Sequence, residues 1–191
     1  MAADNFLVFT GAATGGLLIG KATQPEGEST DDAMAKAKAI EIASFSFGLS
    51  MPDTTGSGTT GSSVGRIKWD EFTIEKDVDQ STAPLFNACS AGAHFANMLI
   101  AVRKSGGSHL LYLQYMFSQV FVTNVSWSGG DGDTNPKETV KFRFGAMGVQ
   151  YIQQKPDGTQ GTKLSAAWSA IENTNSMGDA ASGAYLADTS A

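Results

Sequence analysis

The feature that most constrains the fold is a long run, residues 109–127, that is apolar at both parities. One parity carries Leu111, Leu113, Tyr115, Phe117, Phe121 and Val125, and the other carries Leu110, Tyr112, Met116, Val120 and Val122. Successive side chains of a strand point to opposite faces, so the run predicts a very long strand, or a bent pair, covered on both faces. In a single-domain all-β protein, we expect another subunit to cover the second face.

Further β patterns surround this run. They cover residues 6–9, 40–47, 70–78, 95–104, 139–153 and 162–171. The apolar parity slips between Ile42 and Phe45, and it switches again near Gly145 and Gly148. Such switches are typical of β-bulges. The pattern therefore predicts a mainly β protein.

One segment, residues 79–92, has the pattern of a short helix. Ser81 or Thr82 can cap its start, and Pro84 fits the first turn, where its missing N–H has no cost. Gly92 fits the left-handed position that ends a helix. A short apolar helix among many strands predicts a plug packed on a β-barrel or sandwich.

The 191 residues fit one domain with a substantial core. We expect a folded domain over residues 1–175 and a flexible tail over residues 176–191. Long connections are expected over about 10–39, with room for a helical turn near 31–38, and over 50–65. The last of these is rich in Gly, Ser and Thr and cannot build a core.

The charge composition argues against nucleic-acid binding. Thirteen Lys and Arg against nineteen Asp and Glu give a net charge of −6, and no basic cluster is present. Charged residues make up 17% of the chain, below the usual ~25%. A surface with few charges is typical of subunits whose surfaces are covered in an assembly, and also of turn-rich β-proteins.

The sequence predicts no disulfide, secretory signal or membrane span. Cys89 is the sole cysteine, and no positively charged region opens the chain. The most apolar run is interrupted by Gln114, Ser118, Gln119 and Asn124. We therefore expect that a dedicated machine exports the protein if it leaves the cell.

No motif in the sequence supports catalysis or cofactor binding. Residues 15–21 match the GxxxxGK half of a phosphate-binding loop, but the required Ser or Thr is replaced by Ala22. A Cys89–His94 pair is weaker than the alternative that Cys89 is a small apolar residue of the helix. We expect no enzyme activity and no cofactor.

No metal site is predicted either. Asp131, Asp133 and Asn135 have the spacing of the first calcium ligands of an EF-hand, but Pro136 and Phe142 replace the required Gly and Glu. A solvated acidic turn explains these residues better.

Many short motifs share their order and spacing with one known family. They are Gly27-Glu28-Ser29, Asp31-Asp32, Ile40-Glu41-Ile42, Ser44-Phe45-Ser46-Phe47-Gly48, Asp79-x-Ser81-Thr82, Pro84-Leu85, Ala88-Cys89-Ser90, Gly92-x-His94-Phe95, Arg103-Lys104-x-Gly106-Gly107, Tyr112-Leu113, Glu138, Phe142-x-Phe144, Tyr151-x-x-Gln154 and Trp168. In these the chain resembles the Hcp (hemolysin-coregulated protein) family, which forms the tube of bacterial type VI secretion systems. It departs from the family in a longer first connection, in a Pro84 one place later, and in its tail.

The resemblance implies a two-sheet β-barrel with one short helix packed on it. It also implies homohexameric rings that stack into a hollow tube inside a sheath and beneath a spike. Such tubes leave the bacterial cytoplasm for target cells without a signal peptide, and their lumen can carry small effector proteins. The implied partners are further copies of the chain, spike, sheath and effectors, with no nucleic acid and no membrane.

The resemblance and the strand patterns together suggest roles for a few residues. Phe45 and Phe47 are expected to face the barrel core, which turns Ser46 toward the lumen or a neighbour. Ser46 is a candidate cargo-facing residue, against the alternative of an ordinary exposed serine. Ile100 and Phe117 are expected in core or subunit packing. Residues 50–65 are a candidate ring-to-ring contact.

Three other functions remain open on the sequence. A monomeric β-barrel could bind a ligand in its interior, and a phage-type tail tube would share the ring architecture. A hydrolase is the third, since some relatives carry catalytic C-terminal extensions, but residues 176–191 are too short to form a domain.

Overall fold

The structure is a computed structural model that describes residues 3–14, 24–51, 66–105, 110–132, 134–156 and 159–176. Three predictions fall largely outside these ranges. They concern the glycine motif of residues 15–21, most of the 50–65 connection, and the tail beyond residue 176.

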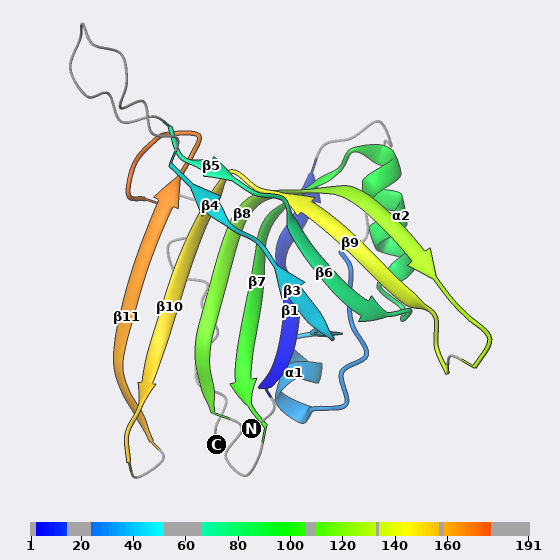
Figure 1. Cartoon of the computed structure of the whole chain (residues 1–191), viewed down its shortest axis with the longest axis horizontal. Coiled ribbons are helices and arrows are strands. Elements are labelled where there is room, and N and C mark those ends of the chain that lie inside the picture. The colour runs from blue at the N-terminus through cyan, green and yellow to red at the C-terminus, as the bar shows by residue number, and fades with distance from the viewer. Residues whose placement is uncertain are drawn as a thin grey trace, which may run out of the picture.

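The described residues form eleven strands and two helices (Figure 1). In chain order they are β1 (Ala3–Thr14), α1 (Asp32–Lys36), β2 (Ile40–Ile42), β3 (Ser44–Ser46), β4 (Leu49–Ser50), β5 (Lys68–Trp69), β6 (Phe72–Asp77), α2 (Thr82–Ala91), β7 (His94–Lys104), β8 (Leu111–Ser128), β9 (Lys137–Arg143), β10 (Ala146–Gln154) and β11 (Gln160–Ser169). The predicted mainly β fold is confirmed. β1 is longer than the sequence predicted, and the first connection accordingly begins after Thr14.

Nine strands belong to one antiparallel sheet, while β4 and β5 pair separately. The order of the main path is β2-β1-β7-β8-β9-β6-β3, and β10 and β11 branch from β8. β8 can serve both branches because it is 18 residues long. Its first half pairs with β10 from Leu113 to Ser118, and its second half pairs with β9 from Phe121 to Ser128.

The two ends of the main path meet at Ala43. β2 and β3 are the first and last strands of the path, and only Ala43 separates them in sequence. The N–H of Ala43 donates to the carbonyl of Glu75 on β6 at 2.8 Å. The expected barrel of two sheets is therefore one branched, curved sheet whose ends are joined by the covalent chain.

The long strand β8 changes its buried face at Gln119. This residue has a φ of 53°, a left-handed conformation that side chains other than glycine adopt rarely. Phe117 precedes the irregularity and Val120 follows it, yet both are in the core, whereas Phe121 is 42% exposed. The prediction that Phe117 and Phe121 share a face is wrong, because the irregularity at Gln119 resets the alternation.

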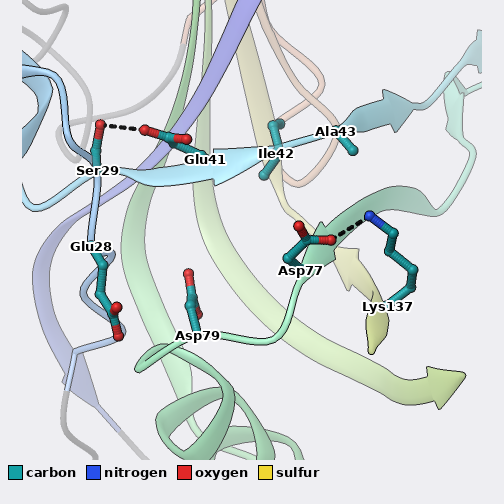
Figure 2. A pocket seen from close by; sticks show the side chains of 8 residues that line it. All are labelled: Glu28, Ser29, Glu41, Ile42, Ala43, Asp77, Asp79 and Lys137. Atoms are coloured by element: carbon teal, nitrogen blue, oxygen red, sulfur yellow. Dashed lines mark hydrogen bonds and ion pairs between the residues drawn. The ribbon is translucent and has the colours of Figure 1, made fainter. Parts of the chain in front are cut away.

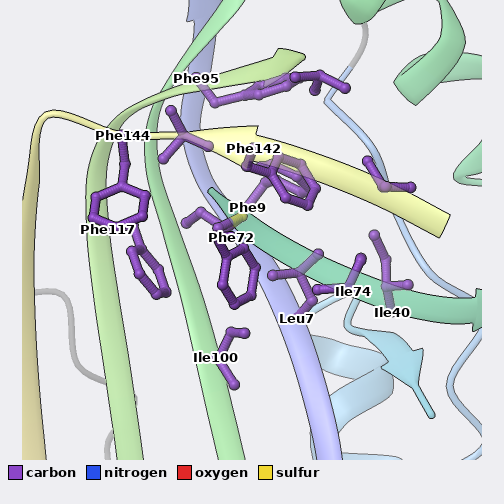
Figure 3. Packing of buried hydrophobic residues seen from close by; sticks show 14 of the residues in the cluster. Leu7, Phe9, Ile40, Phe72, Ile74, Phe95, Ile100, Phe117, Phe142 and Phe144 are labelled. Atoms are coloured by element: carbon purple, nitrogen blue, oxygen red, sulfur yellow. The ribbon is translucent and has the colours of Figure 1, made fainter. Parts of the chain in front are cut away.

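The main core lies inside the curve of the sheet, and Figure 3 shows its aromatic centre. The rings of Phe117 and Phe144 have centroids 4.8 Å apart, and those of Phe72 and Phe117 are 5.0 Å apart. Aromatic pairs at such distances add to the stability that comes from the buried area. The space that a ligand-binding barrel would leave open is filled here by side chains.

A second cluster covers the opposite face of β1, β7 and β8. Met34 of α1 is fully buried there beside Leu99 and Met116. We expected another subunit to cover the second apolar face of the 109–127 run. For this part of the face the expectation is wrong, because α1 and the segment that follows it provide the cover.

Helix α2 forms as predicted, but without the expected side-chain cap at its first turn. Ser81 occupies the N-cap position without a side-chain cap bond. The N–H of Ser81 donates to Asp79 Oδ1 at 2.8 Å, and the N–H of Asp79 donates to Thr82 Oγ1 at 3.3 Å. Gly92 ends the helix with a φ of 64°, as the sequence predicted.

Candidate assembly surfaces

Ser46 lies on an exposed polar sheet face made by β3, β6 and β9. Cross-strand pairing aligns Ser46 with Thr73 and Lys141, and in the next row it aligns Ser44 with Glu75. Ser44 Oγ donates to Glu75 Oε2 at 3.0 Å. We call this face the polar wall; its residues are Ser44, Ser46, Thr73, Glu75, Thr139 and Lys141.

The aromatic neighbours of Ser46 point the other way, as strand alternation requires. Phe47 is half-buried, and its ring centroid is 5.0 Å from that of Tyr115 and 5.7 Å from that of Phe117. Phe45 is also half-buried and lies 6.0 Å from Tyr115 in an edge-on contact. Both rings pack against the main core.

Ile100 and Phe117 lie within that core. Both side chains are 0% exposed, on the neighbouring strands β7 and β8. They are therefore packing residues of the single chain, and neither is available to a second subunit without unfolding (Figure 3).

Strands β10 and β11 extend the sheet beyond the core; we call this pair the wing. Three rows of side chains run from β8 across it on the core-facing side. The rows are Phe117–Met147–Trp168, Tyr115–Val149–Ala166 and Leu113–Tyr151–Leu164. Exposure rises outward along the last row, to 46% at Tyr151 and 64% at Leu164. The core-facing side of the sheet thus continues past the residues that cover it.

The other side of the wing carries a row of polar side chains, together with the buried Ile152. Gln114 Nε2 donates to Gln150 Oε1 at 3.4 Å, and Gln150 Nε2 donates to Ser165 Oγ at 3.3 Å. β10 carries no charged residue, and β11 carries only Lys163, which pairs with Ile152 on this polar side. The core-facing side of the wing therefore carries no charged side chain.

A second exposed apolar surface lies on α2. Phe86 is 51% exposed and Trp127 is 48% exposed, with ring centroids 6.2 Å apart. We call these two residues the helix patch. α2 itself carries no charged residue. Figure 1 shows α2 and β11 at opposite ends of the molecule.

A buried charge network fixes α2 to the sheet. Lys76 and Glu138 are both 0% exposed, and Lys76 Nζ lies 2.8 Å from Glu138 Oε2 and 2.7 Å from Asp79 Oδ1. Thr82 Oγ1 and Trp127 Nε1 donate to the Glu138 carboxylate at 2.9 Å and 3.2 Å. The network joins β6, β9, α2 and the tryptophan of the helix patch.

Sequence reasoning missed this network, although one signal for it was present. Lys76 shares the parity of Phe72 and Ile74 on β6, so the alternation places it on the core side. Val78 has the same parity but is 38% exposed. A charged residue at a core parity indicates a buried ion pair, but its partner Glu138 is 62 positions away.

Arg103 and Asp31 form a second buried ion pair, which holds α1. Arg103 is 2% exposed and donates to both Asp31 oxygens, at 2.9 Å and 2.8 Å. Its guanidinium also lies 5.3 Å from the ring centre of Phe6. The hydrogen bond from Arg103 lowers the pKa of Asp31 to about 2. Asp31 also accepts from the N–H groups of Ala33 and Met34, so the same carboxylate caps α1.

The hollow in Figure 2 is acidic. It has a volume of about 320 Å³ and is lined in part by Glu28, Glu41, Asp77 and Asp79. Asp77 is paired with Lys137, and Glu41 accepts from Ser29 Oγ at 2.8 Å. Within the described ranges, no three His, Cys, Asp or Glu side chains are grouped to hold a metal ion.

The Cys89 and His94 side chains have separate packing roles. Cys89 is half-buried against the main core, and the ring of His94 lies 5.2 Å from that of Phe121. Neither of the helices in the described residues has the length and hydrophobicity needed to span a lipid bilayer.

Comparison with known proteins gives consistent matches. The family model described as "Type VI secretion system effector, Hcp" matches residues 12–151. Protein hcp1 of Pseudomonas aeruginosa is 31% identical over 110 residues, which are 56% of this chain and 68% of that protein. The matched family span contains the polar wall and α2 and ends at Tyr151, before β11.

Two solved structures support the same fold. One is described as a type six secretion system protein, with a TM-score of 0.75 and 26% identity over 91% of this chain and 99% of that chain. The other is Hcp1 from Salmonella typhimurium, with a TM-score of 0.68 and 27% identity over 91% of this chain and 98% of that chain.

Proposed function

The chain belongs to the Hcp family of type VI secretion system proteins, and from this we propose that it is a structural subunit that forms homohexameric rings. The rings stack into the inner tube of the secretion apparatus, within the sheath and beneath the spike. The subunit is made in the bacterial cytoplasm and leaves through this machinery for a target cell.

The observation that carries the proposal is the wing. Leu164 and Tyr151 continue an apolar row of the core, yet they are 64% and 46% exposed. Contiguous exposed apolar surface usually marks a protein contact. A ring subunit would cover this surface, whereas a monomer would leave it in water.

The interior argues against the monomeric ligand-binding barrel. The space inside the curved sheet is filled by the aromatic residues of the main core, including Phe72, Phe117 and Phe142. A ligand of drug size needs a pocket of roughly 300–1,000 Å³ with apolar lining. The hollow of Figure 2 reaches the lower end of that range, but four of its eight lining residues are carboxylates.

We assign the polar wall to the lumen of the ring. Its serine, threonine and charged side chains offer hydrogen bonds without an apolar surface that would hold an effector irreversibly. Ser46 lies within this face and is exposed, so it is our candidate for contact with small effector proteins in transit. The role is structural and non-enzymatic.

The direct test is to image the purified protein. We expect six-fold rings by electron microscopy and the mass of six chains by light scattering at micromolar concentration. Monodisperse monomers under these conditions would refute the ring. Stacking is tested separately, by looking for tubes as the concentration rises.

A further inference from the structure

We infer that, within the proposed ring, the wing of each subunit packs on the helix patch of the next. This inference rests on the proposed function and adds to it the two surfaces that form the seam. In this arrangement, a second copy of this chain covers the apolar side of the wing.

The position of the two surfaces supports the pairing. The wing and α2 lie at opposite ends of the sheet (Figure 1). A contact between different surfaces of identical subunits repeats head to tail and closes into a ring when the rotation allows it. A contact of the wing with another wing would instead use the same surface twice and stop at a dimer.

The chemistry of the two surfaces also matches. The core-facing side of the wing presents Tyr151 and Leu164, and the helix patch presents Phe86 and Trp127. Neither the wing's core-facing side nor α2 carries a charged residue. The buried centres of protein interfaces are depleted of charges and enriched in aromatic residues.

The helix patch is held in a fixed position before any contact forms. Trp127 donates to Glu138, and Glu138 in turn binds Lys76 and Thr82 in the buried network. A surface that is already ordered loses less conformational entropy on binding. The network thus links the buried Lys76–Glu138 pair directly to the exposed aromatic pair.

Chemical cross-linking tests the pairing. In a Cys89→Ser background, Leu164→Cys and Phe86→Cys are combined in one chain and treated with a short bismaleimide. We expect a ladder of covalent products up to six chains on a denaturing gel. Both replaced side chains are more than half exposed, so the variant should fold, which its thermal unfolding checks.

The matched control moves one cysteine by one position. Ser165→Cys with Phe86→Cys keeps the distance along β11 but places the thiol on the polar side of the wing, and we expect little cross-linking. A second control, Leu164→Cys alone, should stay monomeric on the gel.

The outcomes separate the two proposals. Six-fold rings that give no ladder from the Leu164–Phe86 pair would contradict the proposed seam but not the proposed ring. An equally strong ladder from the Ser165 pair would also overturn the seam, as would dimers from Leu164→Cys alone. A Cys89→Ser parent that is purely monomeric by light scattering would refute the ring itself.

Discussion

The polar wall and the wing belong to one sheet and follow the same alternation, but they differ in how far their apolar sides are covered. In the polar wall, the apolar side of each strand faces the core, and the exposed side carries residues such as Ser46 and Glu75. In the wing, the opposite side is only partly exposed, with Ile152 buried and Ser165 exposed, while the apolar side extends past the core to Leu164. The comparison shows that the apolar side is buried in the polar wall and is about half exposed or more in the outer row of the wing.

The largest effect should come from a change that damages both regions. Phe117 is fully buried and begins a row that runs into the wing. We expect Phe117→Asp to lower the unfolding free energy by about 4 kcal/mol or more, since it buries an unpaired carboxylate. Ile100→Asp should act similarly. Denaturant unfolding at fixed protein concentration measures both.

The exposed Phe121 of the same strand provides a matched control. Phe121→Asp should leave folding nearly intact, because the side chain is 42% exposed beyond the Gln119 irregularity. Equal losses from Phe117→Asp and Phe121→Asp would contradict the change of face.

The next effect concerns the network that supports the helix patch. Lys76→Met leaves Glu138 buried without its cation, and breaking a buried pair in this way costs about 3–5 kcal/mol. We expect a matching loss in chemical denaturation. Lys76→Met combined with Glu138→Gln should recover part of it, and a double variant no better than the single one would speak against this account.

The ion pair that holds α1 should give a pH-dependent effect. The folded state lowers the pKa of Asp31 from 3.8 to about 2, so the ionised carboxylate stabilises the fold above pH 3.8, and this contribution disappears as the pH falls through 2. Asp31→Asn should be less stable than the parent at pH 7, and the gap should narrow in acid. Thermal unfolding at several pH values measures it; a gap that widens in acid would contradict the assignment.

The wing should affect assembly with little effect on folding. Leu164→Glu adds a charge to an exposed side chain, so we expect its unfolding free energy to change by less than about 0.5 kcal/mol while rings are lost. Ser165→Glu, on the polar side of the same strand, should retain rings. Light scattering compares the assembly state of the two variants. Loss of rings in both would contradict the proposal that the core-facing side of the wing, and not its other side, forms the seam.

The smallest effect on structure is expected at the polar wall. Ser46→Gln changes only an exposed side chain of β3, so stability and ring formation should match the parent within about 0.5 kcal/mol. The amount of a small effector that co-purifies should change. The matched variant Ser44→Gln measures the same quantity for a substitution in the neighbouring row. Unchanged effector recovery in the Ser46 variant would favour the alternative of an ordinary exposed serine.

Local patterns in the sequence predicted much of this fold. α2 could be placed because Pro84 and Gly92 mark its ends, and the alternation of residues 70–78 identified β6. In place of the bulge expected between Ile42 and Phe45, Ala43 separates β2 from β3, which pair with different strands. In each case the determining contacts lie within a few residues of one another.

The remainder depended on contacts between distant segments. Periodicity does not reveal that β8 changes partner along its length, so the wing was not predicted. It also does not reveal that Met34 covers Met116, and for this reason a neighbouring subunit was assigned to that surface. The left-handed conformation of Gln119 has no local signal, because the residue is not a glycine.

The outer edge of β11 has a consequence for the subunit before assembly. β11 pairs with β10 on one side, and on its other side the described residues supply only an isolated bridge between Ser169 and Thr174. An unpaired strand edge is a template for uncontrolled stacking of chains, and lysine is the residue that most often protects such edges. Lys163 is the only charge on this strand. In the proposed assembly, ring closure would compete with such stacking of newly made subunits, and the ammonium group of Lys163 opposes the stacking.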